Sequence, residues 1–278
     1  NGMKRFYHKD GKVKREEKYT AGKKSGIVRE YFEDGRPKEM AEYSNDQSDG
    51  RSNTWWPSGK TKDKGAFRNG KKVGEWNYYH PNGTMSMAGR YQDDAMIGRW
   101  KHYAADGRLQ KEGDYTVNDV VIKGKSVKRS AESGLWKVYR YNGYNKELAM
   151  EVALSNGMID NTKPSKIYQG GKLAGTGVLQ IGLVKGIYEI LRNGSPTGKI
   201  PSSAVPPDEP EKNITHRWTG DWEEPRRQGQ WKEFFPNGKL RAEGEYMVGK
   251  KNGIWKVFNA DGSENTAESG NYMMGRKR

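Results

Sequence analysis

Short runs of apolar and aromatic residues alternate along this chain with polar turns that contain glycine, and the pattern repeats every 24 residues. One glycine column comprises Gly11, Gly35, Gly59, Gly83 and Gly107, and a second comprises Gly2, Gly26, Gly50, Gly74 and Gly98. An aromatic column keeps the same interval at Tyr19, Tyr43, Phe67, Tyr91 and Tyr115. The period resumes near the other end, where Trp231 and Trp255 are also 24 residues apart. A fixed period of this length predicts a repeat array.

The residues before the first glycine column predict hairpin tips. Asn-Gly and Asp-Gly between apolar residues favour a two-residue type I′ turn, which needs positive φ at both central residues. The predicted tips are Asp10-Gly11, Asp34-Gly35, Ser58-Gly59, Asn82-Gly83, Asp106-Gly107, Asn142-Gly143, Gly170-Gly171, Asn193-Gly194, Asn237-Gly238 and Asp261-Gly262. A second turn, such as GKKSG (22–26), GKKVG (70–74) or GKKNG (249–253), returns the chain to the next hairpin. The chain is therefore expected to form an all-β antiparallel meander with two strands per repeat.

Counting outward from a two-residue tip pairs each tryptophan with a glycine, or a residue that replaces it, on the adjacent strand. Trp76 faces Gly89, Trp100 faces Gly113 and Trp231 faces Gly244. A bare glycine leaves space for the indole ring. The tyrosines two residues after these glycines are expected on the same face of the sheet as the glycines, because side chains alternate between the two faces along a strand. By the same count Val13, Leu109, Leu173 and Leu240 join them, so we expect one continuous apolar core face.

A further aromatic column lies four residues before each tip and, by parity, is expected on the opposite face. It contains Tyr7, Tyr31, Trp55, Tyr79, Tyr103, Tyr139, Phe234 and Phe258. Two interpretations stay open. In one, the rings pack on their neighbours in a twisted sheet. In the other, they form an exposed ladder that binds a ligand.

Breaks in the period divide the chain into four predicted parts. These are regular repeats at 1–117, divergent repeats with an insertion at 118–194, a proline-rich linker at 195–216 and further repeats at 217–278. Within the second part Leu179 takes the place of a core tyrosine, and Ile187 takes that of a tryptophan. In the last part the repeat pattern resumes with Trp222, seven residues before Gly229. Asn1-Gly2 occupies the closing position of a preceding repeat, so we expect further residues before Asn1.

Composition supports short strands joined by turns. Of the 278 residues 32% are hydrophobic and 31% charged, while 36 glycines and 11% aromatic residues set the chain apart from a disordered one. The absence of cysteine excludes disulfides and cysteine-based metal sites. No apolar run is long enough to predict a transmembrane helix.

No catalytic, cofactor-binding or metal-binding residues are predicted. His8, His80 and His102 recur with the repeat, so they are expected to be ordinary strand or turn residues. The glycines of GGKLAGTG (170–177) lack the Lys-Ser/Thr ending of a phosphate-binding loop. We therefore expect a protein that is not an enzyme and needs no cofactor or small-molecule substrate.

The repeat skeleton resembles the MORN repeat, and more closely the bacterial MORN-variant repeat found in proteins often labelled antitoxin-like. The resemblance is carried by GEWNYYHPNGTMSMAGRYQDDAMIG (74–98) and GQWKEFFPNGKLRAEGEYMVGKKNG (229–253). It implies an elongated, solenoid-like stack of hairpins that serves as a scaffold. It also implies protein assembly or binding to acidic phospholipids, and it slightly favours the bacterial periplasm or cell envelope over the cytoplasm.

The leading hypothesis is a non-enzymatic scaffold that binds proteins within a larger assembly, such as one in the cell envelope. One alternative uses the net charge of +15 to bind acidic phospholipid or nucleic acid. Its candidate residues are the aromatic column above together with Lys23, Lys24, Lys71, Lys72, Lys250 and Lys251. A second alternative, implied by the family label alone, is an antitoxin or immunity protein that neutralises a protein toxin.

Overall fold

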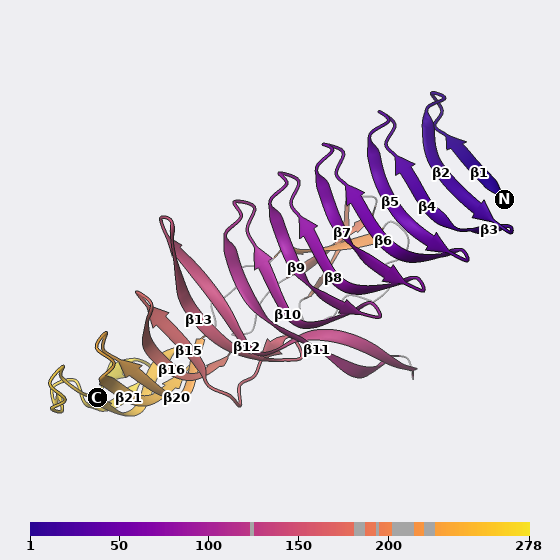
Figure 1. Ribbon diagram of the computed structural model, residues 1–278. Helices are drawn as coiled ribbons and strands as arrows, with labels where there is room; N and C mark the ends of the chain where they lie inside the picture. Colours follow the sequence, from indigo (N-terminus) through magenta and orange to yellow (C-terminus); the bar gives the residue numbers. More distant parts are fainter. Residues whose placement is uncertain (123–124, 181–186, 193–194, 202–213, 220–225) are drawn as a thin grey trace. The chain divides into compact units, whose positions relative to one another are not determined.

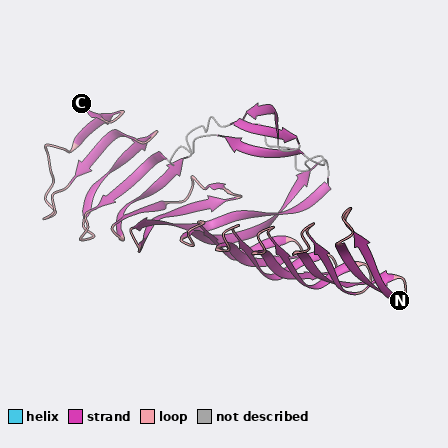
Figure 2. Cartoon of the chain, turned by 90° about the horizontal axis from the view of Figure 1, so that it is seen from above, coloured by secondary structure: helices cyan, strands magenta, loops and turns pink. Residues whose placement is uncertain are grey.

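The computed structural model describes residues 1–122, 125–180, 187–192, 195–201, 214–219 and 226–278. These residues form β-strands joined by turns, and none of them is helical (Figures 1 and 2). The predicted all-β antiparallel meander of sequential hairpins is confirmed. The chain divides into two compact units. Unit 1 comprises Asn1–Asp160 and Ile167–Lys172, and unit 2 comprises Asn161–Lys166 and Leu173–Arg278.

In unit 1 each strand pairs antiparallel with the strands next to it in the sequence, except that Gly26–Tyr31 pairs with Val13–Thr20 and not with the short strand Lys23–Lys24 between them. The strands are β1 (Gly2–Tyr7), β2 (Val13–Thr20), β3 (Lys23–Lys24), β4 (Gly26–Tyr31), β5 (Pro37–Ser44), β6 (Gln47–Trp55), β7 (Thr61–Arg68), β8 (Lys71–Tyr79), β9 (Met85–Gln92), β10 (Ala95–Tyr103), β11 (Leu109–Ile122), β12 (Lys125–Asn142), β13 (Asn145–Ser155) and β14 (Met158–Ile159). A further strand, β15 (Ser165–Gln169), contains residues of both units.

Unit 2 continues the hairpin pattern and adds a small separate sheet. Its strands are β16 (Lys172–Gln180), β17 (Ile187–Arg192), β18 (Ser195–Pro201), β19 (Ile214–Thr219), β20 (Arg226–Phe234), β21 (Leu240–Met247), β22 (Lys250–Val257), β23 (Gly270–Met273) and β24 (Arg276–Lys277). β16 pairs directly with β20, and β17 lies between β18 and β19 in a three-stranded sheet.

This pairing corrects one prediction and bears on another. Ile187 does not replace a core tryptophan, because its strand belongs to the three-stranded sheet and Trp231 of β20 pairs with Gly177 of β16 instead. Leu179 does lie in the core, fully buried. Ser195–Pro201, at the start of the predicted linker, is strand β18. The predicted tip Asn193-Gly194, residues 202–213 of the linker and Trp222 lie outside the described residues. The boundaries of the four predicted parts remain predictions.

The two kinds of turn differ from the prediction, except at Gly170-Gly171, where both residues have positive φ as predicted. At Asn82-Gly83 only the glycine has positive φ, and hydrogen bonds from the His80 N–H to the Thr84 carbonyl and from the Gly83 N–H to the His80 carbonyl close a three-residue loop. The opposite turns have two residues with positive φ, as in Asn69-Gly70, where φ is 50° and 78°. Because Arg68 pairs with Lys71 across that loop, it is the two-residue type I′ turn.

At six tips the Asn or Asp has a different role from the one predicted, since its side-chain oxygen accepts a hydrogen bond from the backbone N–H two residues later. The Thr84 N–H donates to Asn82 at 3.0 Å, and the Arg36 N–H donates to Asp34 at 2.9 Å. This Asx turn explains the residue preference without positive φ. The longer loop shifts the register by one residue. A bulge in β9, where Ser86 is the extra residue opposite the step from Tyr78 to Tyr79, shifts it back.

The predicted pairing of tryptophan with glycine is therefore confirmed, but the ring covers a different glycine. Trp76 pairs with Gly89 of β9, and Trp100 pairs with Gly113 of β11. A Cβ added to Gly89, however, would lie 2.1 Å from the ring of Trp100, and one added to Gly65 would lie 2.3 Å from Trp76. Each indole thus covers the glycine of the preceding hairpin, so the rings join neighbouring repeats.

A bulge at the second glycine column directs each ring backward. In β10 the register with β9 shifts between Ile97 and Lys101, and Gly98 there has a φ of 60°. Glycine reaches such a conformation without a Cβ clash. The second glycine column is therefore required by the bulge that positions the tryptophan two residues later.

One group of residues predicted to lie on the core face lies on the other face. The residues two after the tip pair with the outer aromatic column: Tyr79 with Met85, Tyr103 with Leu109 and Phe234 with Leu240. Directly opposed residues of an antiparallel pair share a face. Since Tyr79 and Trp76 are three residues apart on β8, Met85 and its equivalents lie with the outer column and not with the tryptophans.

Candidate binding surfaces

The tryptophan face is the core of each array and is not open to a ligand. Trp76, Trp100, Trp136, Trp231 and Trp255 are at most 2% exposed. In unit 1 the rings alternate edge to face, from Phe67 and Trp76 through Tyr91 and Trp100 to Tyr115 and Trp136, with centroids 5.2–6.0 Å apart. Such contacts stabilise aromatic pairs beyond the burial of their area.

The lysine pairs predicted to bind an anion separate into two kinds. Lys23, Lys71 and Lys250 are exposed, whereas Lys24, Lys72 and Lys251 are half-buried. The ammonium of Lys72 lies 4.3 Å from the ring centroid of Trp76 and 5.2 Å from that of Tyr91, and Lys251 lies 4.3 Å from Trp255. Burial lowers the pKa of both lysines. The second lysine of each pair is therefore part of the aromatic core.

The outer aromatic column is mostly half-buried. Tyr31, Trp55, Tyr79, Tyr103, Tyr139, Phe234 and Phe258 are partly covered, and Tyr7 alone of the column is largely open, at 57% exposure. Their partners come from neighbouring strands: the Tyr139 hydroxyl donates to Glu112, and Lys64 lies 5.8 Å from the ring centroid of Tyr79. The interpretation that these rings pack on their neighbours accounts for such contacts.

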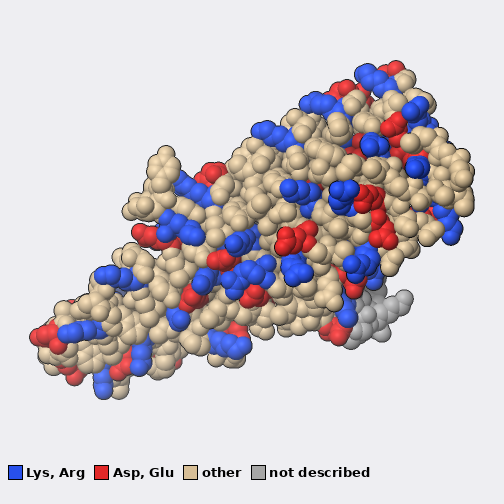
Figure 3. All heavy atoms as spheres, viewed as in Figure 1, with Lys and Arg blue, Asp and Glu red and all other residues tan. Residues whose placement is uncertain are grey.

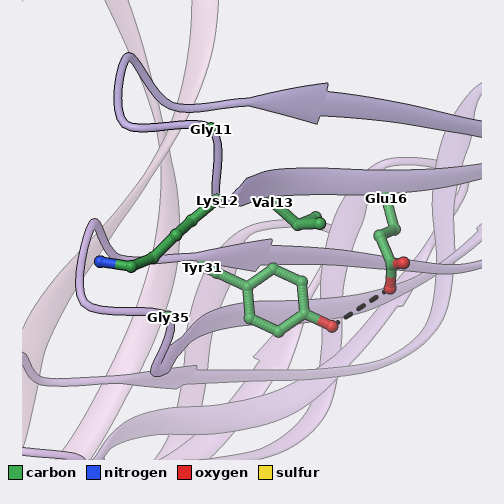
Figure 4. Close-up of a pocket in the computed structure, with 6 residues that line it drawn as sticks. All are labelled: Gly11, Lys12, Val13, Glu16, Tyr31 and Gly35. Carbon is green, nitrogen blue, oxygen red and sulfur yellow. Dashed lines mark hydrogen bonds between the residues drawn. The ribbon is translucent and has the colours of Figure 1, made fainter.

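A hollow of about 450 Å³ lies beside this column, between the first two hairpin tips (Figure 4). Its floor carries Tyr31, whose hydroxyl donates to Glu16 at 3.2 Å, and Lys12 borders it. A hydrogen bond from Arg5 is the main cause of a lowered pKa at Glu16, while burial and Glu16 raise the pKa of Tyr31. The polar groups of the hollow are thus already paired within the protein.

Two of the histidines, His8 and His80, connect repeats. Nε2 of His8 and of His80 lies within hydrogen-bonding distance of the carbonyl oxygens of Tyr31 and Tyr103, at 3.1 and 3.0 Å. In the described part of the chain no cluster of three or more His, Cys, Asp or Glu could hold a metal ion. Nor does the described chain contain a helix long and apolar enough to cross a membrane.

The surface has two distinguishing features whose form the sequence analysis did not predict, although it placed an insertion within 118–194 and a turn at 249–253. The first is an arm, formed where β11 and β12 extend beyond the repeat so that Thr116–Ile122 pairs with Lys125–Ala131 (Figure 1). The second is a pair of apolar type I′ turns in unit 2, at Val248-Gly249 and Met274-Gly275. The sequence does contain a signal for these turns: Val248-Gly249 before Lys250 and Met274-Gly275 before Arg276 occupy the same position in the repeat as Asn69-Gly70 before Lys71.

Charges elsewhere are mixed. On the face drawn in Figure 3, Lys and Arg lie among Asp and Glu instead of forming a stripe of one sign. Many are paired across the hairpins, as Lys111 with Glu132 at 2.7 Å and Arg51 with Glu42 at 2.9 Å.

These features define a class of protein: an array of antiparallel hairpins whose aromatic core lies on one face of each sheet. The family model described as MORN repeat variant matches residues 24–45, 72–93 and 227–247. Each match begins at a cation of the core, namely Lys24, Lys72 or Arg227. The resemblance to MORN-variant repeats is confirmed at these three segments.

No curated protein matches the chain. One solved structure that aligns with it is the crystal structure of TcdB2-TccC3 without the hypervariable C-terminal region. The alignment covers 99% of this chain and 18% of that chain, with 12% identity and a TM-score of 0.17. At that score the likeness carries no argument about fold or function.

Proposed function

We propose that this protein is a non-enzymatic repeat scaffold that binds protein partners within a larger assembly. The arm of β11 and β12 is the observation that carries the proposal. The regular repeats use their recurring aromatic and cationic side chains for contacts with one another, whereas the arm departs from the repeat. Inserted segments on a rigid array are where specific contacts are commonly placed.

The base of the arm offers a recessed surface with charges of both signs. A hollow of about 380 Å³ there is lined by Asp93, Asp94 and Ile97 on one side and by Val117 and Lys128 on the other. Beyond it, the pairs Asn118 with Arg129 and Asp119 with Lys128 continue the two-stranded ribbon away from the repeats. Such a surface suits a polar protein segment better than an apolar small molecule.

The experiment replaces residues 117–130 by Asn-Gly, which connects Thr116 to Ala131 through the type I′ turn of the other repeats. Chemical crosslinking in cells that naturally produce the protein, followed by mass spectrometry, compares this variant with the wild type. We expect the variant to fold and to lose the crosslinked partner. A wild type that crosslinks no protein above the background of an unrelated control contradicts the proposal.

The lipid or nucleic-acid alternative has less support, because Lys24, Lys72 and Lys251 lie over aromatic rings and the surface charges are mixed. It predicts affinity for phosphatidylserine vesicles or for single-stranded DNA that falls steeply with salt. Measuring both affinities over a range of salt concentrations separates it from the scaffold.

A further inference from the structure

The last two type I′ turns of unit 2 begin with larger apolar residues than the type I′ turns of unit 1. A type I′ turn places its first residue in the left-handed region, where Asn, Asp and Gly are favoured and β-branched residues are outliers. In unit 1 that residue is Ala21, Asn45, Asn69, Asp93, Asn156 or Gly170. In unit 2 it is Val248, with a φ of 50°, and Met274, with a φ of 49°.

Burial does not compensate for these unfavourable conformations. Val248 is 48% exposed and Met274 is 44% exposed, and the residues before them, Met247 and Met273, are 40% and 47% exposed. The equivalent preceding residues of unit 1 are polar: Thr20, Ser44, Arg68, Gln92, Ser155 and Gln169. Unfavourable local choices without a gain in folding are typical of functional positions.

The two turns are adjacent and form one surface. The Gly275 N–H donates to the Lys251 carbonyl at 2.8 Å, and a Cβ added to Gly275 would lie 3.8 Å from Cβ of Lys250. We define the apolar turn patch as Met247, Val248, Met273 and Met274. It therefore presents four exposed apolar side chains along one edge of the unit 2 sheet.

The charge around the patch has one sign. The segments Tyr246–Lys251 and Tyr272–Arg278 contain five Lys or Arg and no Asp or Glu. Lys251 lies over Trp255, and Lys277 donates to the carbonyls of Thr266 and Ala267, so both are engaged in the fold. Lys250 and Arg276 are exposed and form no ion pair within the described residues. Each follows its turn glycine directly.

We propose that the apolar turn patch, with Lys250 and Arg276, docks an acidic protein segment that also carries apolar side chains. Complementary charge selects the acidic segment, and exposed methionines provide an adaptable apolar contact. Interfacial membrane binding commonly uses Trp, Phe or Leu, and none of these is in the patch. This inference deepens the proposed function and depends on it for its partner class.

The test uses the whole chain and three labelled 15-residue peptides of equal length. The first combines Glu with Leu and Phe, the second replaces Leu and Phe by Ser, and the third replaces Glu by Lys. Fluorescence anisotropy measures binding to each peptide. We expect the first peptide to bind at least tenfold more tightly than the others, and its affinity to decrease with salt.

Variants then locate the site. Val248→Asn with Met274→Asn removes two apolar side chains and places a favoured residue in each turn, so a loss of folding is not expected. Lys250→Glu with Arg276→Glu reverses the charge beside the patch. Each pair should weaken the first peptide about tenfold or more, whereas Lys23→Glu with Lys71→Glu, the matched control in unit 1, should leave its affinity unchanged.

Several results would overturn the inference: equal binding of the first two peptides, indifference to both pairs of variants, or patch-dependent binding to phosphatidylserine vesicles without peptide binding. Its failure is distinguishable from failure of the scaffold proposal. If the chain with both Asn substitutions still crosslinks its cellular partner, the scaffold proposal stands and the proposal for the patch fails.

Discussion

Single positions in the core of this protein act as pairs that belong to different hairpins. Where Trp100 covers a strand, that strand carries Gly89, and a Cβ there would lie 2.1 Å from the ring. Where Ser52 replaces the tryptophan, the strand carries Ala41, which is 2% exposed. The chain itself thus shows that the size of one residue is matched to the size of the other.

We expect Gly89→Ala to lower the free energy of unfolding by about 2 kcal/mol, since overfilling a packed core costs roughly 1–3 kcal/mol. Urea unfolding followed by tryptophan fluorescence measures the loss. The control is the same substitution in a Trp100→Ser background, which copies Ser52 and Ala41 and should be close to neutral. An equal loss in both backgrounds would show that the glycine is needed for its backbone and not for the ring.

The core tyrosines predict a dependence on alkaline pH. Burial, together with the hydrogen bond to Glu233, raises the pKa of Tyr246 to about 12, and its hydroxyl lies 2.7 Å from Glu233. Because the folded pKa exceeds the value of about 10 for an unfolded tyrosine, this contribution is complete below pH 10. It is lost as pH rises from about 10 to 12, by up to about 2 kcal/mol.

Urea unfolding at a series of pH values from neutral to alkaline measures this decline. Tyr246→Phe is the matched variant: it should be less stable at neutral pH by about 1 kcal/mol, the typical net value of a hydrogen bond, and should show a shallower decline above pH 10. The same alkaline slope in both proteins would assign the decline to other groups.

Among the elements, the turns show how far sequence reasoning reaches. Most Asn-Gly and Asp-Gly pairs predicted hairpin tips correctly in place, but their residue preference comes from the Asx hydrogen bond, not from a type I′ turn. At Asn142-Gly143 the prediction was one residue off, since Asn142 pairs with Asn145 and the loop is Gly143-Tyr144. The pairing of Trp76 with Gly89 was still predicted correctly, because one bulge offsets the extra loop residue. Counting along the sequence cannot detect two local irregularities that cancel.

The turn conformations also predict that exchanging Val and Asn changes the free energy of unfolding in opposite directions at Val248 and at Asn69. Val248→Asn should raise the free energy of unfolding by about 1 kcal/mol, because a left-handed conformation costs a residue with a Cβ roughly 1–2 kcal/mol and Asn tolerates it better. Asn69→Val, at the equivalent turn of unit 1, should lower it by a similar amount. Thermal unfolding of both variants measures the two changes, and a loss at Val248→Asn would contradict the argument.

Across the whole chain, repetition was readable while its interruptions were not. A fixed period reveals the stacked hairpins, since every repeat contains the same glycines and rings. Neither the extension of β11 and β12 nor the three-stranded sheet of β17–β19 has a periodic signal. The sequence therefore indicated an insertion within 118–194 but not its structure, and Ile187 was assigned to the array. The candidate binding surfaces lie mostly in these departures, which is why they were hardest to predict.

The same repetition predicts that one complete repeat can be removed. Each repeat contacts its neighbours through the ring over the preceding glycine and through turn hydrogen bonds, such as Asp94 N–H to the Lys72 carbonyl at 3.1 Å. Deleting residues 72–95 joins Lys71 to Met96 and places Trp100 where Trp76 lies over Gly65. Since stability in such arrays is roughly a sum of repeat and interface contributions, we expect a folded, cooperative protein that is less stable than the wild type. Circular dichroism and urea unfolding measure both properties. Deleting only residues 72–83 is the control. It removes most of β8 and its tip, so the next strand can no longer run antiparallel to both of its neighbours, and it should abolish cooperative unfolding. If the two deletions behave alike, the 24-residue unit is not the structural repeat.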